Sequence, residues 1–184
     1  NRSYVDLAAA LGGPVAFLVR ARAAILRDLG PALAPQNAFQ LIQGLETLPL
    51  RLARHFDNAI KVADFLNGHA KVDRVVFPGL QTGEDRRRAE TYLSGGFGAL
   101  IGVEPKGGED AALALIDNLK LIYHLANIGD ARSLAIHPWS TTHGQLSAEA
   151  KLAAGVTPAL VRLSIGIENP DDIIADLDQA LARL

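Results

Sequence analysis

Residues 160–184 read LVRLSIGIENPDDIIADLDQALARL, and this stretch carries the clearest local signals of secondary structure in the chain. Residues 160–165 alternate as a strand does, which places three aliphatic side chains on one face and Arg162 on the other. A helix follows, because Asn169 is a good N-cap and Pro170 suits the first helical position. The C-terminal end of the chain is therefore expected to be a strand followed by an amphipathic helix.

Apolar periodicity over the remaining chain predicts two helices, followed by alternating strands and helices. The expected helices are residues 14–29, 37–67, 84–93, 109–119 and 147–154, and the expected strands are residues 72–77, 97–103, 121–125 and 132–136. Pro49 lies within the longest helical pattern and lacks a backbone donor, so we expect a kink or break there. This order predicts an α/β protein with an α+β small domain, whose sheet is covered mainly on one face by helices.

The composition excludes several classes of protein. The chain has 184 residues, 49% of them hydrophobic, and a formal net charge of -2. The apolar content excludes a disordered chain, and the near-zero charge argues against a nucleic-acid partner. Arginines interrupt the two longest apolar runs, so we expect no membrane span.

Two residue types are absent. The absence of Cys excludes disulfides, thiolate metal sites and Cys nucleophiles, and it fits a cytoplasmic protein. Met is also absent, and the first residue is Asn1. We therefore expect that the chain is part of a longer polypeptide.

Several candidate motifs do not match the pattern of a known kind of site. Gly96 and Gly98 begin a glycine-rich pattern, but it leads into a strand and not into the helix that a dinucleotide site needs. His137 and His143 are six residues apart across a proline, which is not the spacing of helical metal ligands. The arginine run 86–88 is most simply a solvated helix face.

Arg162 is the strongest single candidate for a binding residue. An arginine within an apolar strand must find an anion or reach water. Its planar guanidinium matches a carboxylate in a two-point contact. The alternative interpretation is an internal salt bridge or a surface strand.

Two irregular segments, residues 123–130 and 137–143, are rich in small polar residues. Loops beside a sheet are common places for functional sites. The alternative is a solvent-exposed loop whose Ser, Thr and Asn side chains cap their own backbone.

Five sequence blocks together resemble a known family. They are GLETL at 44–48, HLANIGD at 124–130, SLAIHP at 133–138, STTH at 140–143 and RLSIGIE at 162–168. Their order and spacing resemble the C-terminal part of the Cys/Met-metabolism enzymes that use pyridoxal 5'-phosphate (PLP). The second block resembles the O-acetylhomoserine sulfhydrylases, because the γ-synthases and lyases usually have serine where Asn127 stands.

The resemblance implies a fold and an assembly. The fold would be the C-terminal domain of the aspartate-aminotransferase-like (fold type I) PLP-dependent transferases. Residues 1–35 would be the end of the large PLP domain and a linker, and residues 36–184 the connecting helix and the C-terminal small domain. The parent enzyme would be a cytoplasmic homotetramer.

The resemblance also implies a reaction, in which O-acetyl-L-homoserine and sulfide give homocysteine and acetate. PLP would act as the electron sink. Arg162 matches the family's carboxylate-binding arginine, and Asn127 matches a position beside the same carboxylate. Both are therefore expected to bind substrate.

The family's Schiff-base lysine lies in an S-x-T-K type motif, and none of the five lysines here has that context. The resemblance therefore places this lysine upstream of Asn1. We assign no catalytic, cofactor-binding or metal-binding residue, and expect the chain alone to be inactive and to hold no PLP.

Two alternatives remain open. One is another enzyme of the family, such as a cystathionine γ-synthase, a γ-lyase or a sulfhydrylase for a different acylated substrate. The other is a non-catalytic module that binds a carboxylate or a partner chain.

Overall fold

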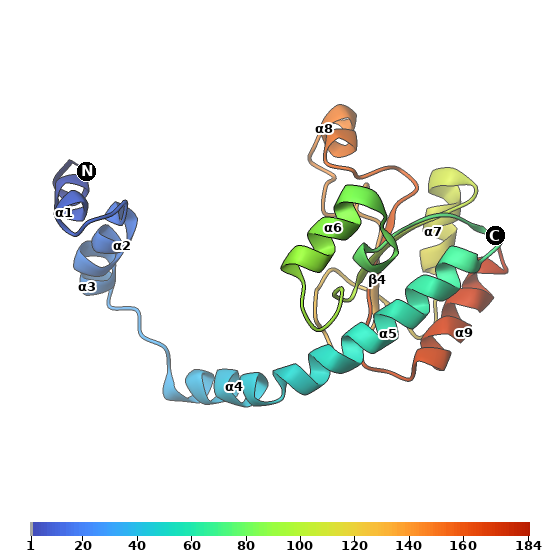
Figure 1. The fold of residues 1–184 in the computed structure, drawn as a ribbon, viewed down its shortest axis with the longest axis horizontal. Coiled ribbons are helices and arrows are strands. Elements are labelled where there is room, and N and C mark those ends of the chain that lie inside the picture. Colours follow the sequence, from blue (N-terminus) through green and yellow to red (C-terminus); the bar gives the residue numbers. More distant parts are fainter. Residues whose placement is uncertain (1) are drawn as a thin grey trace. The chain divides into compact units, whose positions relative to one another are not determined.

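The structure, a computed structural model, describes residues 2–184. These residues form two compact units, one ending at Glu46 and the other spanning Thr47–Leu184 (Figure 1). Asn1, upstream of which the Schiff-base lysine is expected, lies outside the described residues. The position of that lysine and the assignment of residues 1–35 to the end of a larger PLP domain both stay predictions.

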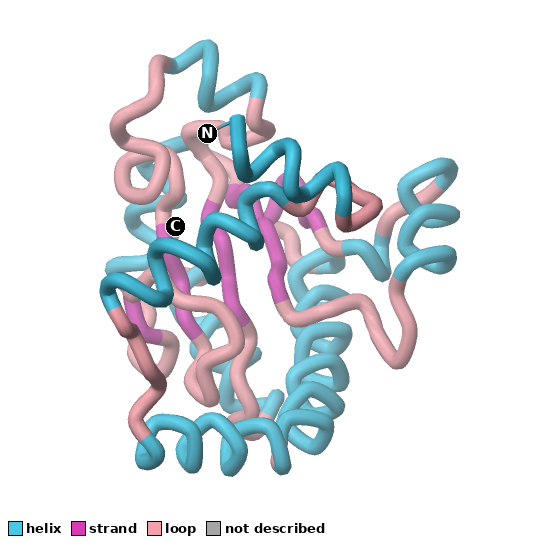
Figure 2. Tube along the Cα trace, turned by 90° about the vertical axis from the view of Figure 1, so that its left-hand side faces the viewer, coloured by secondary structure: helices cyan, strands magenta, loops and turns pink. Residues whose placement is uncertain are grey.

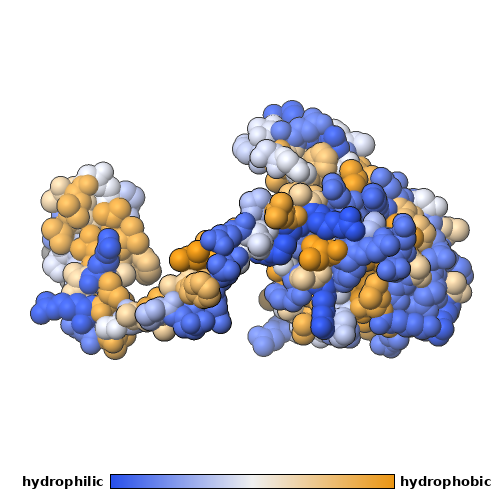
Figure 3. Space-filling view, turned by 90° about the horizontal axis from the view of Figure 1, so that it is seen from below, coloured by the Kyte–Doolittle hydropathy of each residue, from blue (hydrophilic) through white to orange (hydrophobic). Residues whose placement is uncertain are grey.

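The regular secondary structure of the first unit is all helical over its described residues. Its elements are α1 (Arg2–Ala10), α2 (Ala16–Arg20), the π-helix η1 (Ala21–Leu26), α3 (Arg27–Leu29) and α4 (Pro35–Glu46). The middle three are continuous and form the expected helix, which ends at Gly30 with a positive φ of 61°; α1 was not expected. Among the residues of this unit whose burial is described, only Ala8 is buried. Many apolar side chains of the unit are therefore exposed, and Figure 3 shows apolar residues at its surface.

The expected break in the long helical pattern is confirmed. The chain leaves the helix at Thr47, between α4 and α5 (Leu48–Gly68). Pro49 is the second residue of α5, where a missing N–H removes no intrahelical hydrogen bond.

Among the residues that the structure describes, no helix is both long enough and apolar enough to cross a membrane.

The second unit contains one five-stranded sheet (Figure 2). Its strands are β1 (Val72–Val76), β2 (Leu100–Pro105), β3 (Tyr123–His124), β4 (Leu134–Ile136) and β5 (Val161–Ser164). They lie in the order β1-β2-β5-β4-β3, so β5 is central. All neighbouring pairs are antiparallel except β3 and β4, which are parallel.

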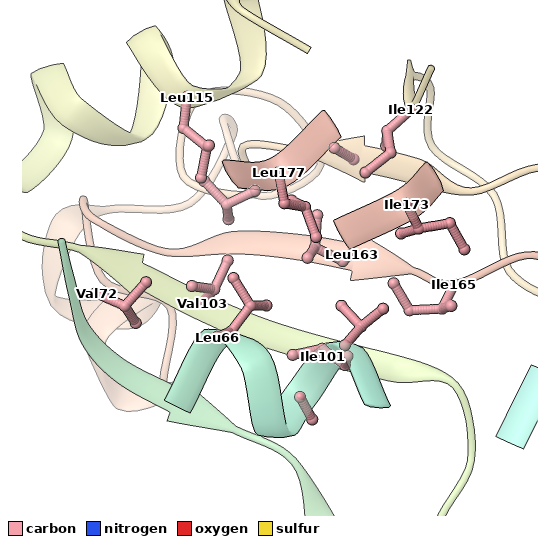
Figure 4. Close-up of a cluster of buried hydrophobic side chains, with 14 of the residues drawn as sticks. Leu66, Val72, Ile101, Val103, Leu115, Ile122, Leu163, Ile165, Ile173 and Leu177 are labelled. Atoms are coloured by element: carbon pink, nitrogen blue, oxygen red, sulfur yellow. The ribbon is translucent and has the colours of Figure 1, made fainter. Parts of the chain in front are cut away.

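Three helices cover one face of this sheet, as expected. They are α5, α7 (Gly108–Asp117) and α9 (Pro170–Leu181), and they pack on the apolar side chains of β2 and β5. In Figure 4, Leu163 of β5 lies among Ile101, Leu66 and Leu177 from three neighbouring elements. Each such side chain contributes roughly 1.5–3 kcal/mol on burial. The remaining elements are η2 (Pro78–Leu80), α6 (Gly83–Tyr92) and α8 (Ala148–Ala153).

Strands β2, β3 and β4 each begin two or three residues later than expected. Gly96 and Gly98 have φ of 150° and 83°, and β2 begins only at Leu100. Residues 120–122 donate their backbone N–H groups to the carboxylate of Asp176 in α9. Those groups are therefore not available to a strand ladder, and β3 keeps only two residues.

The arginines of α6 pair with acids on their own helix, as a solvated face does. Arg86 contacts Glu90 at 2.7 Å, and Arg87 contacts Glu84 at 2.6 Å. The hydrogen bond from Arg87 lowers the pKa of the Glu84 carboxyl below its usual value. Exposed pairs of this kind add little stability.

A network of buried polar groups joins β5 to α5 and β4. His55 Nδ1 donates to the Ile165 carbonyl at 2.6 Å, because that oxygen can only accept. The Glu168 carboxylate accepts from the backbone N–H of Ser133 at 2.6 Å and from its hydroxyl at 2.9 Å. A Cβ on Gly166 would overlap Glu168 Oε2 and lie 2.5 Å from the Ala131 carbonyl oxygen. The network therefore requires glycine at position 166.

Gly166→Ala should lower the free energy of unfolding by about 1–3 kcal/mol, because the added methyl group must displace the Glu168 carboxylate or the backbone. Gly68→Ala is the matched control, since Gly68 ends α5 with open space around it. Urea unfolding monitored by circular dichroism measures both. Equal midpoints for the two variants would contradict the steric argument.

Asp176→Asn should destabilise the chain by about 1–3 kcal/mol, because an NH2 group would face backbone N–H groups that have no other acceptor. Asp117→Asn in α7 removes the same charge from an exposed position and should change stability by less than about 0.5 kcal/mol. Thermal unfolding of both variants gives the comparison. A loss no larger than that of the control would show that the Asp176 contacts are dispensable.

Candidate functional site

Arg162 lies in the middle of the central strand, on the face that α5, α7 and α9 leave uncovered. Its neighbours across the sheet are Gly102 of β2 and Ile136 of β4. Val161 and Leu163 on either side are fully buried in the core, whereas Arg162 is half-buried. The alternation predicted from the sequence is confirmed.

The guanidinium of Arg162 is not neutralised by the described part of the chain. No carboxylate of residues 2–184 forms an ion pair with it. Nη2 donates to the main-chain carbonyl of Asn127 at 3.2 Å, and Nε is buried without a hydrogen-bond partner. The internal salt bridge that the sequence left open is therefore absent from residues 2–184. A half-buried cation in this state favours an external anion.

Asn127 reaches Arg162 from the loop that connects β3 to β4. The backbone N–H of Leu125 bonds to Ala135 at 3.2 Å, which fixes the start of the loop against β4. Gly129 supplies a left-handed turn with φ of 74°. The structure thus brings together the two residues that the sequence singled out.

The two residues share a cavity of about 280 Å³. Ala126, Asn127 and Ile128 form one side of it, and Arg162 and Thr142 complete the lining. Arg162 is the only charged side chain among them. The cavity can therefore hold a small anionic group, with the arginine as its counter-charge.

Thr142 is the one residue of the 137–143 segment that lines this cavity. No sequence pattern had distinguished it from the other polar residues of the segment. The other polar groups of the segment bond mainly to each other. His137 contacts Ser140 Oγ at 2.8 Å and the Pro158 carbonyl at 2.7 Å, and Thr141 Oγ1 donates to the His137 carbonyl. Most of the segment is thus the self-capped loop that was the alternative interpretation.

A second cavity, of about 400 Å³, adjoins the first and shares Ile128 with it. Its walls are mostly apolar, and its lining contains no carboxylate, lysine or arginine. It offers no counter-charge for an ionic substrate.

The residues around Arg162 do not fit the cofactor itself. None of the five lysines lines either cavity. Lys151 is instead buried with its ammonium 4.6 Å from the centre of the Trp139 ring. Within residues 2–184 no group of three or more His, Asp or Glu side chains is arranged to hold a metal ion. The lining of the Arg162 cavity therefore offers one cation, and no lysine that could bond to an aldehyde.

Known proteins similar to this chain agree with the resemblance. Two proteins named O-acetyl-L-homoserine sulfhydrylase match it. The one from Leptospira meyeri is 54% identical over 94% of the chain, and the one from Corynebacterium glutamicum is 52% identical over 98%. The chain spans only 39% and 40% of their lengths.

Solved structures show the same fold. A crystal structure described as an O-acetylhomoserine (thiol)-lyase from Campylobacter jejuni, which carries a pyridoxyl-lysine phosphate, is 46% identical with a TM-score of 0.84. It is matched over 94% of this chain and 41% of that one. A cystathionine γ-synthase from Xanthomonas oryzae is 42% identical with a TM-score of 0.76, over 84% of this chain and 40% of that one. The expected fold, that of the fold type I PLP enzymes, is confirmed.

The family model for Cys/Met-metabolism PLP-dependent enzymes matches residues 10–182, almost the whole chain. Together with relatives more than 50% identical, this match shows that the chain belongs to the Cys/Met-metabolism family of PLP-dependent enzymes.

Proposed function

We propose that this chain supplies the substrate-carboxylate site of a PLP-dependent O-acetyl-L-homoserine sulfhydrylase. The observation that carries the proposal is Arg162, a central-strand cation beside a cavity and without a carboxylate partner in residues 2–184. The names of the relatives supply the substrate, because those most similar to the chain include sulfhydrylases of O-acetyl-L-homoserine. The product would be homocysteine, with acetate as the leaving group.

Arg162 would bind the α-carboxylate of the amino acid through its charged N–H groups. The Asn127 carbonyl, bonded to Nη2, limits the rotation of the guanidinium. Holding the carboxylate at a fixed strand position orients the rest of the substrate, and such orientation supplies part of the rate enhancement. When bound in the complete enzyme, PLP supplies the electron sink for the carbanion. The lysine that holds it would come from residues upstream of Asn1.

A cystathionine γ-synthase is the second candidate, favoured by the matching structure from Xanthomonas oryzae. The two activities differ in the incoming thiol, which is sulfide in one and cysteine in the other. Asn127, where the γ-synthases usually have serine, supports the sulfhydrylase. The homotetrameric assembly and the cytoplasmic location of the parent enzyme stay predictions.

The 184-residue chain alone should show no turnover of O-acetyl-L-homoserine, because it lacks a lysine in the S-x-T-K context. Titration with PLP should give no stable imine absorbance that persists after gel filtration. The Leptospira meyeri enzyme serves as the positive control. A persistent imine band would show that a lysine of this chain binds PLP. It would refute the proposal that the PLP lysine lies upstream of Asn1.

A chimaera tests the carboxylate role directly. Replacing the matched segment of the Leptospira meyeri sulfhydrylase by this chain should give an enzyme that makes homocysteine. In that chimaera, Arg162→Lys should weaken substrate binding by about 2–5 kcal/mol, seen mainly in KM, because an ammonium cannot reproduce the two-point contact.

Arg74→Lys in edge strand β1 is the matched control, since it makes the same change at an exposed arginine. Steady-state kinetics with sulfide, and separately with cysteine, would also separate the two candidate activities. Unchanged KM and kcat in Arg162→Lys would remove Arg162 from the substrate site.

A further inference from the structure

The loop between β3 and β4, residues 125–133, carries a carboxylate with no assigned role. We propose that Asp130 is a positioning residue for Arg162, acting through the main-chain carbonyl of Asn127. The inference deepens the proposed function and rests on it, since Arg162 must bind a carboxylate for its orientation to matter.

Both oxygens of the Asp130 carboxylate are engaged within the loop. Oδ1 accepts the backbone N–H of Arg132 at 3.1 Å, and Oδ2 accepts from Nδ2 of Asn127 at 3.4 Å. The Asn127 amide can present only its NH2 group to Asp130, because its Oδ1 accepts the N–H of Ile128 at 2.9 Å. The Asp130 carboxylate therefore connects Asn127, which precedes Gly129, with Arg132, which follows it.

These hydrogen bonds matter because packing does little to hold this loop. Leu125 and Ile128 are 54% and 60% exposed, so the apolar side chains of the loop are not anchored in the core. Segments with few buried apolar contacts open easily unless hydrogen bonds hold them. Backbone bonds hold the two ends of the loop, from Leu125 to Ala135 and from Ile167 to Ala131. Between these ends, the bonds of Asp130 help to hold the Asn127 carbonyl in position.

The Asn127 carbonyl is in turn the one hydrogen-bond acceptor that residues 2–184 provide to the Arg162 guanidinium. A shift of the loop would thus release Nη2 and let the guanidinium rotate. The path from Asp130 to Arg162 is a chain of two hydrogen bonds, through the side chain and then the carbonyl of Asn127.

Asp130 forms no ion pair with Arg162, so its effect on anion binding should come from geometry. The two mechanisms predict opposite signs. A purely electrostatic role predicts that removing a negative charge near an anion site strengthens anion binding. A positioning role predicts that the same change weakens it.

Asp130→Asn is the test variant, because an amide keeps the shape but has one acceptor oxygen, so it cannot accept from both the Arg132 N–H and the Asn127 NH2 group. Asp73→Asn, on exposed edge strand β1, is the control for the change in charge.

The first readout needs no ligand. The Nε–H of Arg162 is buried, and its nitrogen-15 NMR signal can be assigned by its loss in Arg162→Lys. In the 184-residue chain, Asp130→Asn should shift or broaden this signal, and Asp73→Asn should leave it unchanged. Equal unfolding temperatures of the variants would confirm that the fold is intact.

The second readout is a titration with O-acetyl-L-homoserine, followed by the same signal. Asp130→Asn should raise the dissociation constant about fivefold to tenfold, as expected for one lost hydrogen bond. Asp130→Asn behaving like Asp73→Asn in both readouts would overturn the inference. If O-acetyl-L-homoserine leaves the wild-type Nε signal of Arg162 unchanged, the proposed function is refuted. The ligand-free spectra would still test the role of Asp130.

Discussion

A positive charge in the middle of a β-sheet is the constraint on which the site depends. Arg162 sits in the central strand, opposite Gly102 of β2 and Ile136 of β4, and only the Asn127 carbonyl meets its guanidinium within residues 2–184. Removing a cation from water without a counter-ion is costly, so such an arrangement persists where a ligand completes it. The roles proposed for the loop and the cavity both depend on this side chain.

The rest of the second unit holds that strand in place. The three helices on one face bury Val161 and Leu163, and this leaves the opposite face free for Arg162. The buried contacts of His55 and Glu168 attach the end of β5 to α5 and β4. The backbone of the central strand is thus fixed from two sides before any substrate binds, which is the preorganisation that a binding site needs. The less firmly packed part of the site is the exposed loop that carries Asn127.

Much of the fold could be predicted from local sequence signals. The alternation around Arg162, the cap at Asn169 and Pro170, and the break near Pro49 each identified an element correctly, because each depends on residues close in the sequence. Arg162 and Asn127 were also singled out in advance, and the structure places them 3.2 Å apart between Nη2 and the carbonyl oxygen. Their role in binding substrate stays a prediction.

What the sequence did not predict depends on contacts between distant residues. The shortening of β3 follows from Asp176, more than 50 positions away, which takes the N–H groups that a strand would use. The need for glycine at position 166 follows from the Ala131 carbonyl, and the entry of Thr142 into the cavity follows from the path of an irregular loop. No periodicity or short motif encodes such contacts. The helix α1 was also not predicted.

The most direct measurement is a crystal structure of the chimaera of this chain with the Leptospira meyeri sulfhydrylase, with O-acetyl-L-homoserine bound. The proposed role of Arg162 predicts both carboxylate oxygens of the substrate within about 3 Å of the guanidinium nitrogens, with the Asn127 carbonyl still on Nη2. A substrate carboxylate bound by other residues, with Arg162 turned towards solvent or paired with a protein carboxylate, would contradict it.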